Sequence, residues 1–386
     1  MPRRETARRS SVCPTLRFLL LLTACGLLGK AADAEPHGSQ FVGLKDFSRF
    51  ARSAGPLGEI ILTSPILVTR TEWDELVVTW NVDLTASGGL KVEARGGYSN
   101  QLTKFYVMGL WSPDPATHPR ASVRDQKDAD GDVLTDTLKL GRPTREVQLR
   151  LTLAGEGASV KWLKFVGLSF RDSRKPGSPQ APSRRAWGKA LAVPERSQML
   201  YPGGEVWCSP TTVSMLLSHW SAKLGRPDLE HDVPAVARAV YDPNWPGTGN
   251  WPFNTAYAGA FRGMRAYVSR FTDVSELEDW IASGIPVGVS VSYNLLRGKS
   301  TAGGGHLVVC VGFTKDGDVI VNDPGTKENV RKTFPRESLI KAWAYSQNTV
   351  YLIYPEETRL PRDRFGHWDS TASRRLWSWE TRGQKP

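Results

Sequence analysis

Apolar and polar residues alternate with two different periodicities along the chain. Between residues 41 and 170, short stretches alternate apolar and polar side chains with the period of two that half-buried strands require. Turn-forming residues separate these stretches at the spacing typical of a β-sandwich. The predicted strands cover residues 75–80, 90–95, 103–111, 133–140, 147–153 and 160–168. The sequence therefore predicts an all-β sandwich domain over residues 40–170.

From residue 191 the pattern changes to helical spacing interleaved with buried strands. Apolar side chains recur at helical spacing after residue 208, in Val213, Leu216, Leu217 and Trp220. Further helices are predicted at residues 233–240, 275–283 and 336–344, and strands at residues 286–293, 307–313, 319–322 and 350–354. Helices gathered ahead of a mostly antiparallel sheet are typical of α+β folds. We therefore expect an α+β domain over residues 191–356.

Three segments lie outside these two domains. Residues 171–190 are rich in Pro, Ser, Gly and Arg, which is typical of an exposed linker. Residues 357–386 are polar and basic, and we expect a disordered tail there. Residues 1–34 contain several arginines, then an apolar run, then the small-residue site Ala32-Asp33-Ala34, which together have the layout of a signal peptide.

The N-terminal segment determines the expected location of the protein. Cleavage after Ala34 gives a secreted chain. Residues 22–26 also resemble a lipoprotein cleavage site, so a lipid anchor at Cys25 is the alternative. Beyond this segment no stretch reaches the roughly 18 apolar residues of a membrane span. We expect a secreted or cell-envelope protein with no transmembrane span in the mature chain.

Cys208 begins the predicted helix that follows residue 207. Pro210 suits the first turn of a helix, because a missing N–H costs nothing there. At a helix N-terminus the unsatisfied N–H groups and the positive end of the dipole favour thiolate over thiol, and a nearby imidazolium lowers the pKa further. The position of Cys208 therefore suits a nucleophile.

His306 and Asp323 are placed by a predicted hairpin. His306 follows three glycines and starts a buried strand, and a turn at residues 315–318 leads into a second strand that ends just before Asp323. This hairpin brings Asp323 back beside His306, where its carboxylate fixes the tautomer of the imidazole. Gln198 precedes the cysteine by ten residues, and its amide with the Cys208 backbone N–H is a candidate oxyanion hole.

Each of these residues also has a structural interpretation. A lone cysteine packs as a small hydrophobe, a histidine after glycines is a loop residue, and Asp-Pro forms turns. An isolated glutamine is by itself almost no evidence for a catalytic site. The four residues nevertheless occur in the order Gln198, Cys208, His306 and Asp323, each at the boundary of an element. That coincidence favours the catalytic interpretation.

The same residues carry a resemblance to a known family. Gln198 and the segments at residues 205–211, 304–309 and 321–324 resemble the papain-like cysteine peptidases related to the bacteriocin-processing, double-glycine-leader peptidases. The resemblance covers roughly residues 193–355 and extends to secreted bacterial relatives that have no transporter. Many relatives have glycine after the cysteine, where this chain has Ser209.

The resemblance implies a role for each residue and an α+β papain-like fold. Cys208 would be the nucleophile, His306 the general base and acid, Asp323 the group that orients the histidine, and Gln198 the oxyanion donor. No metal or organic cofactor is implied. The expected function is an exported cysteine peptidase that acts on a peptide or protein. Two alternatives remain: a thiol amidase that acts on cell-wall peptides, and a catalytically inactive binding or adhesion protein.

Charge and the remaining cysteine add two expectations. The formal net charge is +11, of which residues 1–34 supply six basic and two acidic side chains, so the mature chain carries 11 − 4 = +7. The basic residues are dispersed and no nucleic-acid motif accompanies them, so we expect no nucleic-acid partner and propose anionic cell-wall polymers as a candidate surface.

Cys310 lies too far along its strand from His306 to pair with Cys208, and we expect it in the core.

Two features of the predicted β-domain have alternative interpretations. Its aromatic residues either form a carbohydrate platform or fill the core, and we favour the core. These residues are Trp73, Trp80, Tyr98, Tyr106, Trp111 and Trp162. Asp128, Asp130 and Asp132 suggest calcium, but the terminal glutamate of the full loop pattern is missing, so we favour a solvated turn.

Overall fold

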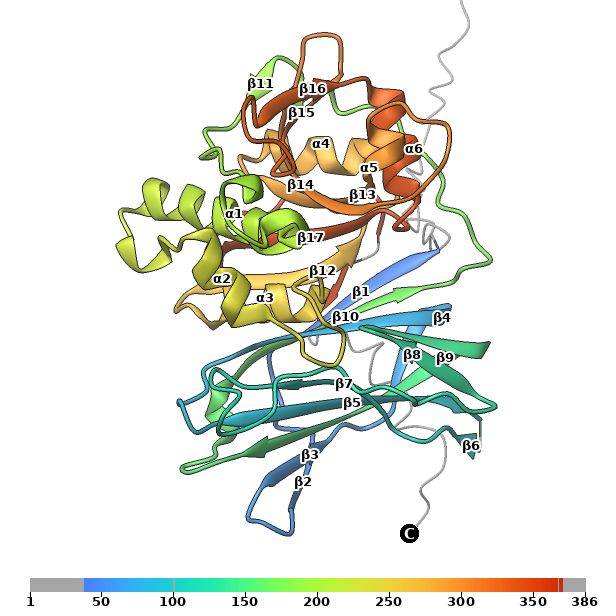
Figure 1. Ribbon diagram of the computed structural model, residues 1–386. Coiled ribbons are helices and arrows are strands. Elements are labelled where there is room, and N and C mark those ends of the chain that lie inside the picture. The colour runs from blue at the N-terminus through green and yellow to red at the C-terminus, as the bar shows by residue number, and fades with distance from the viewer. Residues whose placement is uncertain (1–37, 100, 367, 371–386) are drawn as a thin grey trace, which may run out of the picture. The chain divides into compact units, whose positions relative to one another are not determined.

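The computed structural model describes residues 38–99, 101–366 and 368–370 (Figure 1). The predicted signal peptide, the alternative lipid anchor at Cys25 and the last part of the predicted tail lie outside these residues. An all-β region is followed by a mixed helical and sheet region, which confirms the predicted order of fold classes. No helix among the described residues is long and apolar enough to cross a membrane.

The all-β region is a strongly paired assembly of antiparallel strands. Its strands are β1 (Ser39–Leu44), β2 (Ala51–Ala54), β3 (Ile60–Thr63), β4 (Leu67–Val82), β5 (Gly89–Tyr98), β6 (Gln101–Leu102), β7 (Tyr106–Trp111), β8 (Gly131–Leu134), β9 (Thr137–Ala154) and β10 (Leu163–Arg171). Together with β18 (Trp368–Ser370) they follow the order β18-β1-β10-β4-β9-β3-β2, with β5 and β8 also paired to β9, and β6 and β7 to β5. Figure 1 shows β1, β10 and β4 lying over β5 and β7.

Strand β9 corrects one part of the prediction. The predicted strands at residues 133–140 and 147–153 are largely one strand of 18 residues, without the expected turn between them. Residues on either side of Pro143 pair with different parts of β4, and the register shifts around Trp73. Proline donates no hydrogen bond, so it is tolerated in a strand where the ladder is interrupted. The turn signal at Pro143 therefore marks an irregularity inside a long strand.

Four of the six aromatic residues named above fill the core of the all-β region, whereas Tyr98 and Trp162 are only partly buried. Trp73, Trp80, Tyr106 and Trp111 are all buried, which confirms the core interpretation for these four. Trp80 and Trp111 also meet the ring of Phe253, which comes from the second region. The aromatic core therefore continues across the boundary between the two regions.

The second region is built around one antiparallel sheet. Its helices are α1 (Cys208–Leu224), α2 (Val233–Val240), α3 (Trp251–Ala260), α4 (Val274–Ala282), α5 (Tyr293–Leu296) and α6 (Arg336–Ala344). Its strands are β11 (Lys189–Ala190), β12 (Met264–Arg270), β13 (Val287–Ser292), β14 (Gly305–Phe313), β15 (Val319–Asn322), β16 (Arg331–Phe334) and β17 (Thr349–Pro355), in the order β12-β17-β13-β14-β15-β16. Short 3₁₀ helices cover Val160–Trp162, Arg184–Ala186, Gln198–Leu200, Gly204–Val206 and Pro227–Leu229. The helices predicted at residues 233–240 and 336–344 are confirmed to the residue.

Helix α3 and strand β12 were not predicted. The Asn250 side chain caps α3 by accepting from the Phe253 N–H, and Pro252 lies in the first turn. Most of α3 is buried, so its sequence lacks the polar stripe by which an amphipathic helix is recognised. All seven residues of β12 are buried, including Arg265 and Arg270.

The end of the described chain differs from the expected disordered tail. Strand β18 (Trp368–Ser370) pairs in parallel with β1. The Trp368 ring contacts the rings of Phe41, Tyr267 and Trp280. Burial of this aromatic ring offsets the entropy lost on ordering the segment. Residues 368–370, which belong to the predicted tail, are therefore part of the fold.

Helix α3 also packs closely on strand β4. A Cβ atom at Gly259 would overlap the side chain of Asn81. That side chain donates from Nδ2 to the Ala266 carbonyl at 2.7 Å and accepts from the Ala266 N–H at 3.1 Å. Asn81 thereby joins β4 of the all-β region to β12 of the second region.

We expect Gly259→Ala to lower the free energy of unfolding by about 1–3 kcal/mol, because the added methyl group displaces Asn81 from its two buried hydrogen bonds. Equilibrium urea denaturation measures the change. Gly141→Ala is the matched control, since a Cβ atom there meets only ordinary contacts at 3.6 and 3.7 Å. Equal stability of the Gly259 variant and the wild type would contradict the close packing of α3 on β4.

Candidate active site

Cys208 is the first residue of α1. Trp207 occupies the N-cap position without a side-chain hydrogen bond to the helix, so no side chain caps the first turn. The cysteine is partly exposed and lines a cleft. The next residue, Ser209, is buried, and its hydroxyl lies 2.7 Å from the Tyr351 hydroxyl. The helix therefore presents the Cys208 thiol to the cleft and turns Ser209 into the protein.

The predicted hairpin places His306 beside Asp323. Strands β14 and β15 are antiparallel neighbours, with Val309 opposite Asn322. His306 lies near the start of β14, and Asp323 directly follows β15. The distance from His306 Nε2 to Asp323 Oδ1 is 2.7 Å. Both side chains are buried, which strengthens their interaction.

Cys208 and His306 form a coupled pair. Burial alone would raise the pKa of the Cys208 thiol, but a hydrogen bond from His306 and its charge, with the backbone N–H groups of Leu307 and Ser209, lower that pKa below its ordinary value. Burial would lower the pKa of His306, but its hydrogen bonds to Asp323 and Cys208 raise it to about 9. The arrangement therefore favours a thiolate facing an imidazolium.

Asp323 is held by several donors. Tyr293 donates its hydroxyl to Asp323 Oδ2 at 3.0 Å, and the Gly325 N–H donates to Oδ1 at 2.9 Å. Lys332 lies 3.8 Å from Oδ2. Burial would raise the pKa of Asp323, but the His306 hydrogen bond and charge, with the Gly325 and Tyr293 hydrogen bonds, lower it. Asp323 is therefore held as a carboxylate that faces the imidazole.

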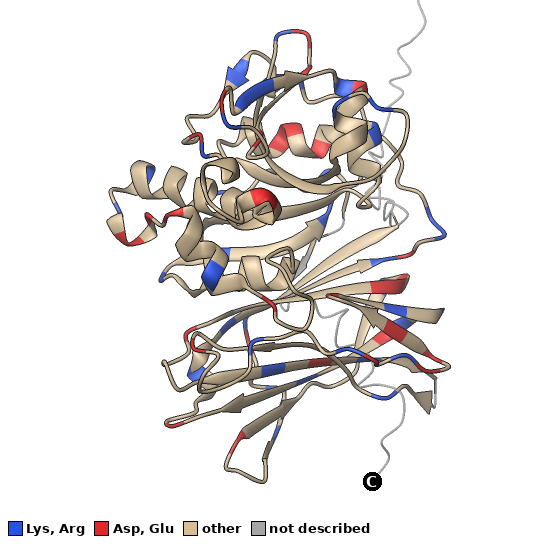
Figure 2. Ribbon diagram, viewed as in Figure 1, with Lys and Arg blue, Asp and Glu red and all other residues tan. Residues whose placement is uncertain are grey.

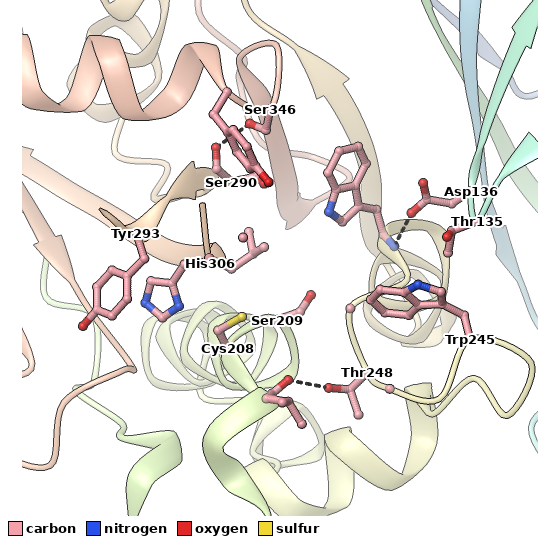
Figure 3. A pocket seen from close by; sticks show the side chains of 18 of the residues that line it. Thr135, Asp136, Cys208, Ser209, Trp245, Thr248, Ser290, Tyr293, His306 and Ser346 are labelled. Carbon is pink, nitrogen blue, oxygen red and sulfur yellow. Dashed lines mark hydrogen bonds between the residues drawn. The ribbon is translucent and has the colours of Figure 1, made fainter. Parts of the chain in front are cut away.

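Tyr293 is a residue of the site that sequence reasoning missed. Its ring lies against His306, with ring centroids 4.1 Å apart and an angle of 32° between the planes (Figure 3). The same side chain donates to Asp323. Tyr293 is the first residue of α5, directly after β13, and no local motif marks it. The pairing of β13 with β14 brings it to the histidine. Tyr293 therefore covers the His306 imidazole and orients the Asp323 carboxylate.

Gln198 also lines the cleft that contains Cys208. Its side chain is buried, and Nε2 donates to the Glu205 carbonyl at 2.8 Å. An amide nitrogen has two hydrogens, so one N–H remains after this bond. The Glu205 contact therefore holds the amide in place without using both donors.

The cleft has a volume of about 1060 Å³ and is built from both regions. Figure 3 shows His306 and Tyr293 on one side of Cys208, with Trp245, Thr135 and Asp136 on the other. Thr135 and Asp136 belong to the all-β region, whereas the others belong to the second region. A cleft of this size suits a peptide segment or another extended ligand.

Two other candidate sites have structural explanations. Cys310 is buried in β14, and burial raises the pKa of its thiol, as expected for a core residue. Both it and Cys208 are free cysteines. Asp128 Oδ1 accepts hydrogen bonds from the N–H groups of Asp130 and Gly131, both at 2.9 Å. This loop is therefore organised as a turn, as expected.

Basic and acidic residues are mixed along the described chain. Figure 2 shows Lys and Arg interspersed with Asp and Glu in both regions. Among the described residues, no group of three or more His, Cys, Asp or Glu side chains is arranged to hold a metal ion.

The coupled pair predicts a bell-shaped dependence of kcat/KM on pH. Activity falls on the acid side where the Cys208 thiolate takes up a proton, at a pH below the ordinary pKa of a thiol. It falls on the alkaline side near pH 9, where His306 loses its proton. Initial rates measured from about pH 4 to about pH 10 check this profile. A single rise near the pKa of a free thiol, about 8.5, with no alkaline limb would contradict the ion pair.

Two family models match parts of this chain. The model of the Peptidase_C39 like family matches residues 190–351, and the model of the Peptidase C39 N-terminal domain matches residues 60–167. Among solved structures, the chain is similar to one described as a C39-like peptidase from Bacillus anthracis, with 16% sequence identity and a TM-score of 0.35. That similarity covers 44% of this chain and 99% of the other. A search of curated proteins finds no match.

Proposed function

We propose that this chain, which belongs to the C39-like peptidase family through residues 190–351, is an exported cysteine peptidase that cleaves peptide bonds with Cys208, His306 and Asp323. The observation that carries the proposal is the set of Cys208, His306 and Asp323, in which His306 is hydrogen-bonded to Asp323 and electrostatically coupled to the Cys208 thiol. This is the arrangement by which a thiolate is activated and its base is oriented. Export is supported by the predicted signal peptide alone.

The reaction begins with attack on the substrate. The Cys208 thiolate attacks the carbonyl carbon of the scissile bond, and the carbonyl oxygen becomes an oxyanion. The Cys208 backbone N–H and the remaining Gln198 amide N–H stabilise this oxyanion. His306 gives its proton to the leaving amine as the C–N bond breaks, which leaves a thioester on Cys208.

Hydrolysis of the thioester completes the cycle. His306, now neutral, takes a proton from a water molecule that attacks the thioester carbon. The C–S bond breaks, the acid product leaves, and the thiolate and imidazolium are restored. Asp323 holds the imidazole in one orientation through both steps and stabilises its charged form. All proton transfers therefore take place between His306, the substrate and water.

The proposal is tested with two substrate classes side by side. The purified mature protein is incubated with casein-derived peptides and with peptidoglycan fragments, and the products are identified by mass spectrometry. Cleavage of peptides that stops after iodoacetamide treatment supports the peptidase. Cleavage confined to peptidoglycan fragments would replace it by a thiol amidase. Binding of either class without cleavage would favour a binding protein.

A further inference from the structure

The tip of the β8–β9 hairpin lies in the cleft that contains Cys208. In this hairpin Leu134 pairs with Thr137, so Thr135 and Asp136 form the turn. All four residues line the cleft. Figure 3 shows Thr135 and Asp136 across the cleft from His306. A segment of the all-β region is therefore part of the wall that faces the candidate nucleophile.

The turn has an unusual backbone. Thr135 has a φ angle of 59°, and the Asp136 N–H donates to the Leu134 carbonyl at 2.7 Å. A β-branched residue rarely adopts this left-handed conformation, and the tight turn that it forms is strained. Strain of this kind persists where surrounding contacts hold it, and it is concentrated at functional sites. The shape of the tip is thus imposed by its surroundings.

Asp136 supplies the contact that holds the tip. Its carboxylate accepts from the Trp251 N–H at 2.9 Å and from the Thr137 hydroxyl at 3.1 Å. Trp251 is the first residue of α3, so the hairpin is attached to the second region. The residue is buried, with 7% of its surface exposed. Asp136 therefore fixes the position of Leu134 within the cleft.

Exposed apolar side chains gather in this cleft. Among the described residues, four of the eleven large apolar side chains that are exposed line it. They are Leu134 at 51%, Val206 at 64%, Trp245 at 45% and Tyr345 at 51% exposure. Single exposed apolar residues are ordinary, but a group in one concave site marks a surface that binds an apolar ligand.

Trp245 is fixed in place although it is exposed. Asp242 Oδ1 accepts from the N–H groups of Asn244 at 3.1 Å and Trp245 at 3.3 Å, which holds the loop. A Cβ atom at Gly249 would lie 3.0 Å from the indole ring, and one at Gly247 would lie 3.3 Å from it. The two glycines therefore leave room for the ring. An aromatic ring ordered before binding loses little entropy when it packs on a ligand.

The lysine and the arginine in the wall lie beside a carboxylate. Lys139 lies 3.0 Å from Glu75, and Arg270 lies 3.1 Å from the same carboxylate. Both cations share the Glu75 carboxylate with Arg171. The acidic residue Glu205 also lines the cleft and is exposed. Beside Leu134 and Trp245, an apolar group of the substrate fits better than a charged group, because burying a charge against apolar side chains is costly.

Resting on the peptidase function proposed above, we propose that Leu134 of the β8–β9 hairpin and Trp245 together form a subsite for a bulky apolar side chain of the peptide substrate. The occupant is the substrate itself, because the same cleft contains Cys208 and His306. The all-β region thereby selects the peptides that the second region cleaves.

The test is a cleavage profile on peptide libraries that vary one position at a time around the scissile bond. The wild type is expected to prefer Leu, Met, Phe or Trp over Ala at one position by about tenfold or more in kcat/KM. Leu134→Ala and Trp245→Ala are each expected to reduce that preference about fivefold in kcat/KM. Equal rates of Cys208 labelling by iodoacetamide show that each variant keeps its active site.

Two matched controls come from the same regions. Leu57 is an exposed leucine of the all-β region, and Tyr241 is an exposed aromatic residue after α2, and neither lines the cleft. Leu57→Ala and Tyr241→Ala are expected to leave the preference unchanged. If the preference of the wild type survives in both cleft variants, or if the wild type has no preference for bulky apolar side chains, the subsite proposal is wrong. The proposed peptidase function would not be affected by either result. Failure of the wild type to cleave any peptide would overturn both.

Discussion

Replacing Cys208 with alanine is expected to abolish peptide hydrolysis, with a loss of at least about 10⁴-fold in kcat. The reason is that no other group near His306 can form the covalent thioester. The second thiol, Cys310, is buried in β14 and its pKa is raised, so it cannot substitute. Hydrolysis rates measured at saturating substrate check the loss.

Cys310→Ala is the matched control for this experiment. It removes the same sulfur atom from the other free cysteine. The variant is expected to lose some stability, because a small cavity remains in the core, and to keep its activity. Thermal unfolding of both variants separates an effect on the fold from an effect on chemistry. Activity that remains in Cys208→Ala would remove the cysteine from the mechanism.

Replacing Asp323 with asparagine is expected to lower kcat/KM by about 10²- to 10⁴-fold. The Asp323 carboxylate accepts from His306 Nε2 at 2.7 Å and stabilises the imidazolium. An asparagine oxygen retains one acceptor but carries no charge, so the pKa of His306 falls. The alkaline limb of the pH profile therefore moves from near pH 9 to lower pH. The pH dependence of kcat/KM measures both effects together.

Asp316→Asn is the control for the carboxylate. Asp316 is exposed in the turn between β14 and β15, so it belongs to the same hairpin but not to the site. Its replacement is expected to leave the rate and the alkaline limb unchanged. An Asp323 variant with reduced activity but an unmoved alkaline limb would show that Asp323 does not control the charge of His306.

The hairpin of the site was predictable because local signals determine it. Three glycines, a buried run and an Asp-Gly turn specify β14 and β15, and the antiparallel pairing then brings Asp323 to His306. The start of α1 was predictable for the same reason, since Pro210 and the helical spacing of apolar residues mark it. The part of the site that depends on neighbours in sequence could therefore be deduced.

The remaining parts depend on contacts between segments far apart in sequence. The pairing of β13 with β14 brings Tyr293 to His306, and no local motif indicates this contact. Thr135 and Asp136 reach the cleft because the all-β region packs on α3, which the sequence pattern did not reveal. Helix α3 is buried on most sides, so it lacks the periodicity on which prediction relies. Tertiary packing, which no local pattern encodes, therefore completes the cleft.

The central claim is that Cys208 is a thiolate held by His306. Intact-mass measurement of iodoacetamide labelling from about pH 4 to about pH 9 tests it directly, with the wild type compared with Cys208→Ala and His306→Ala. The account predicts fast labelling of Cys208 well below pH 8.5, the approximate pKa of a free thiol, and slower labelling once His306 is removed. Labelling that appears only near that pH and does not depend on His306 would contradict it.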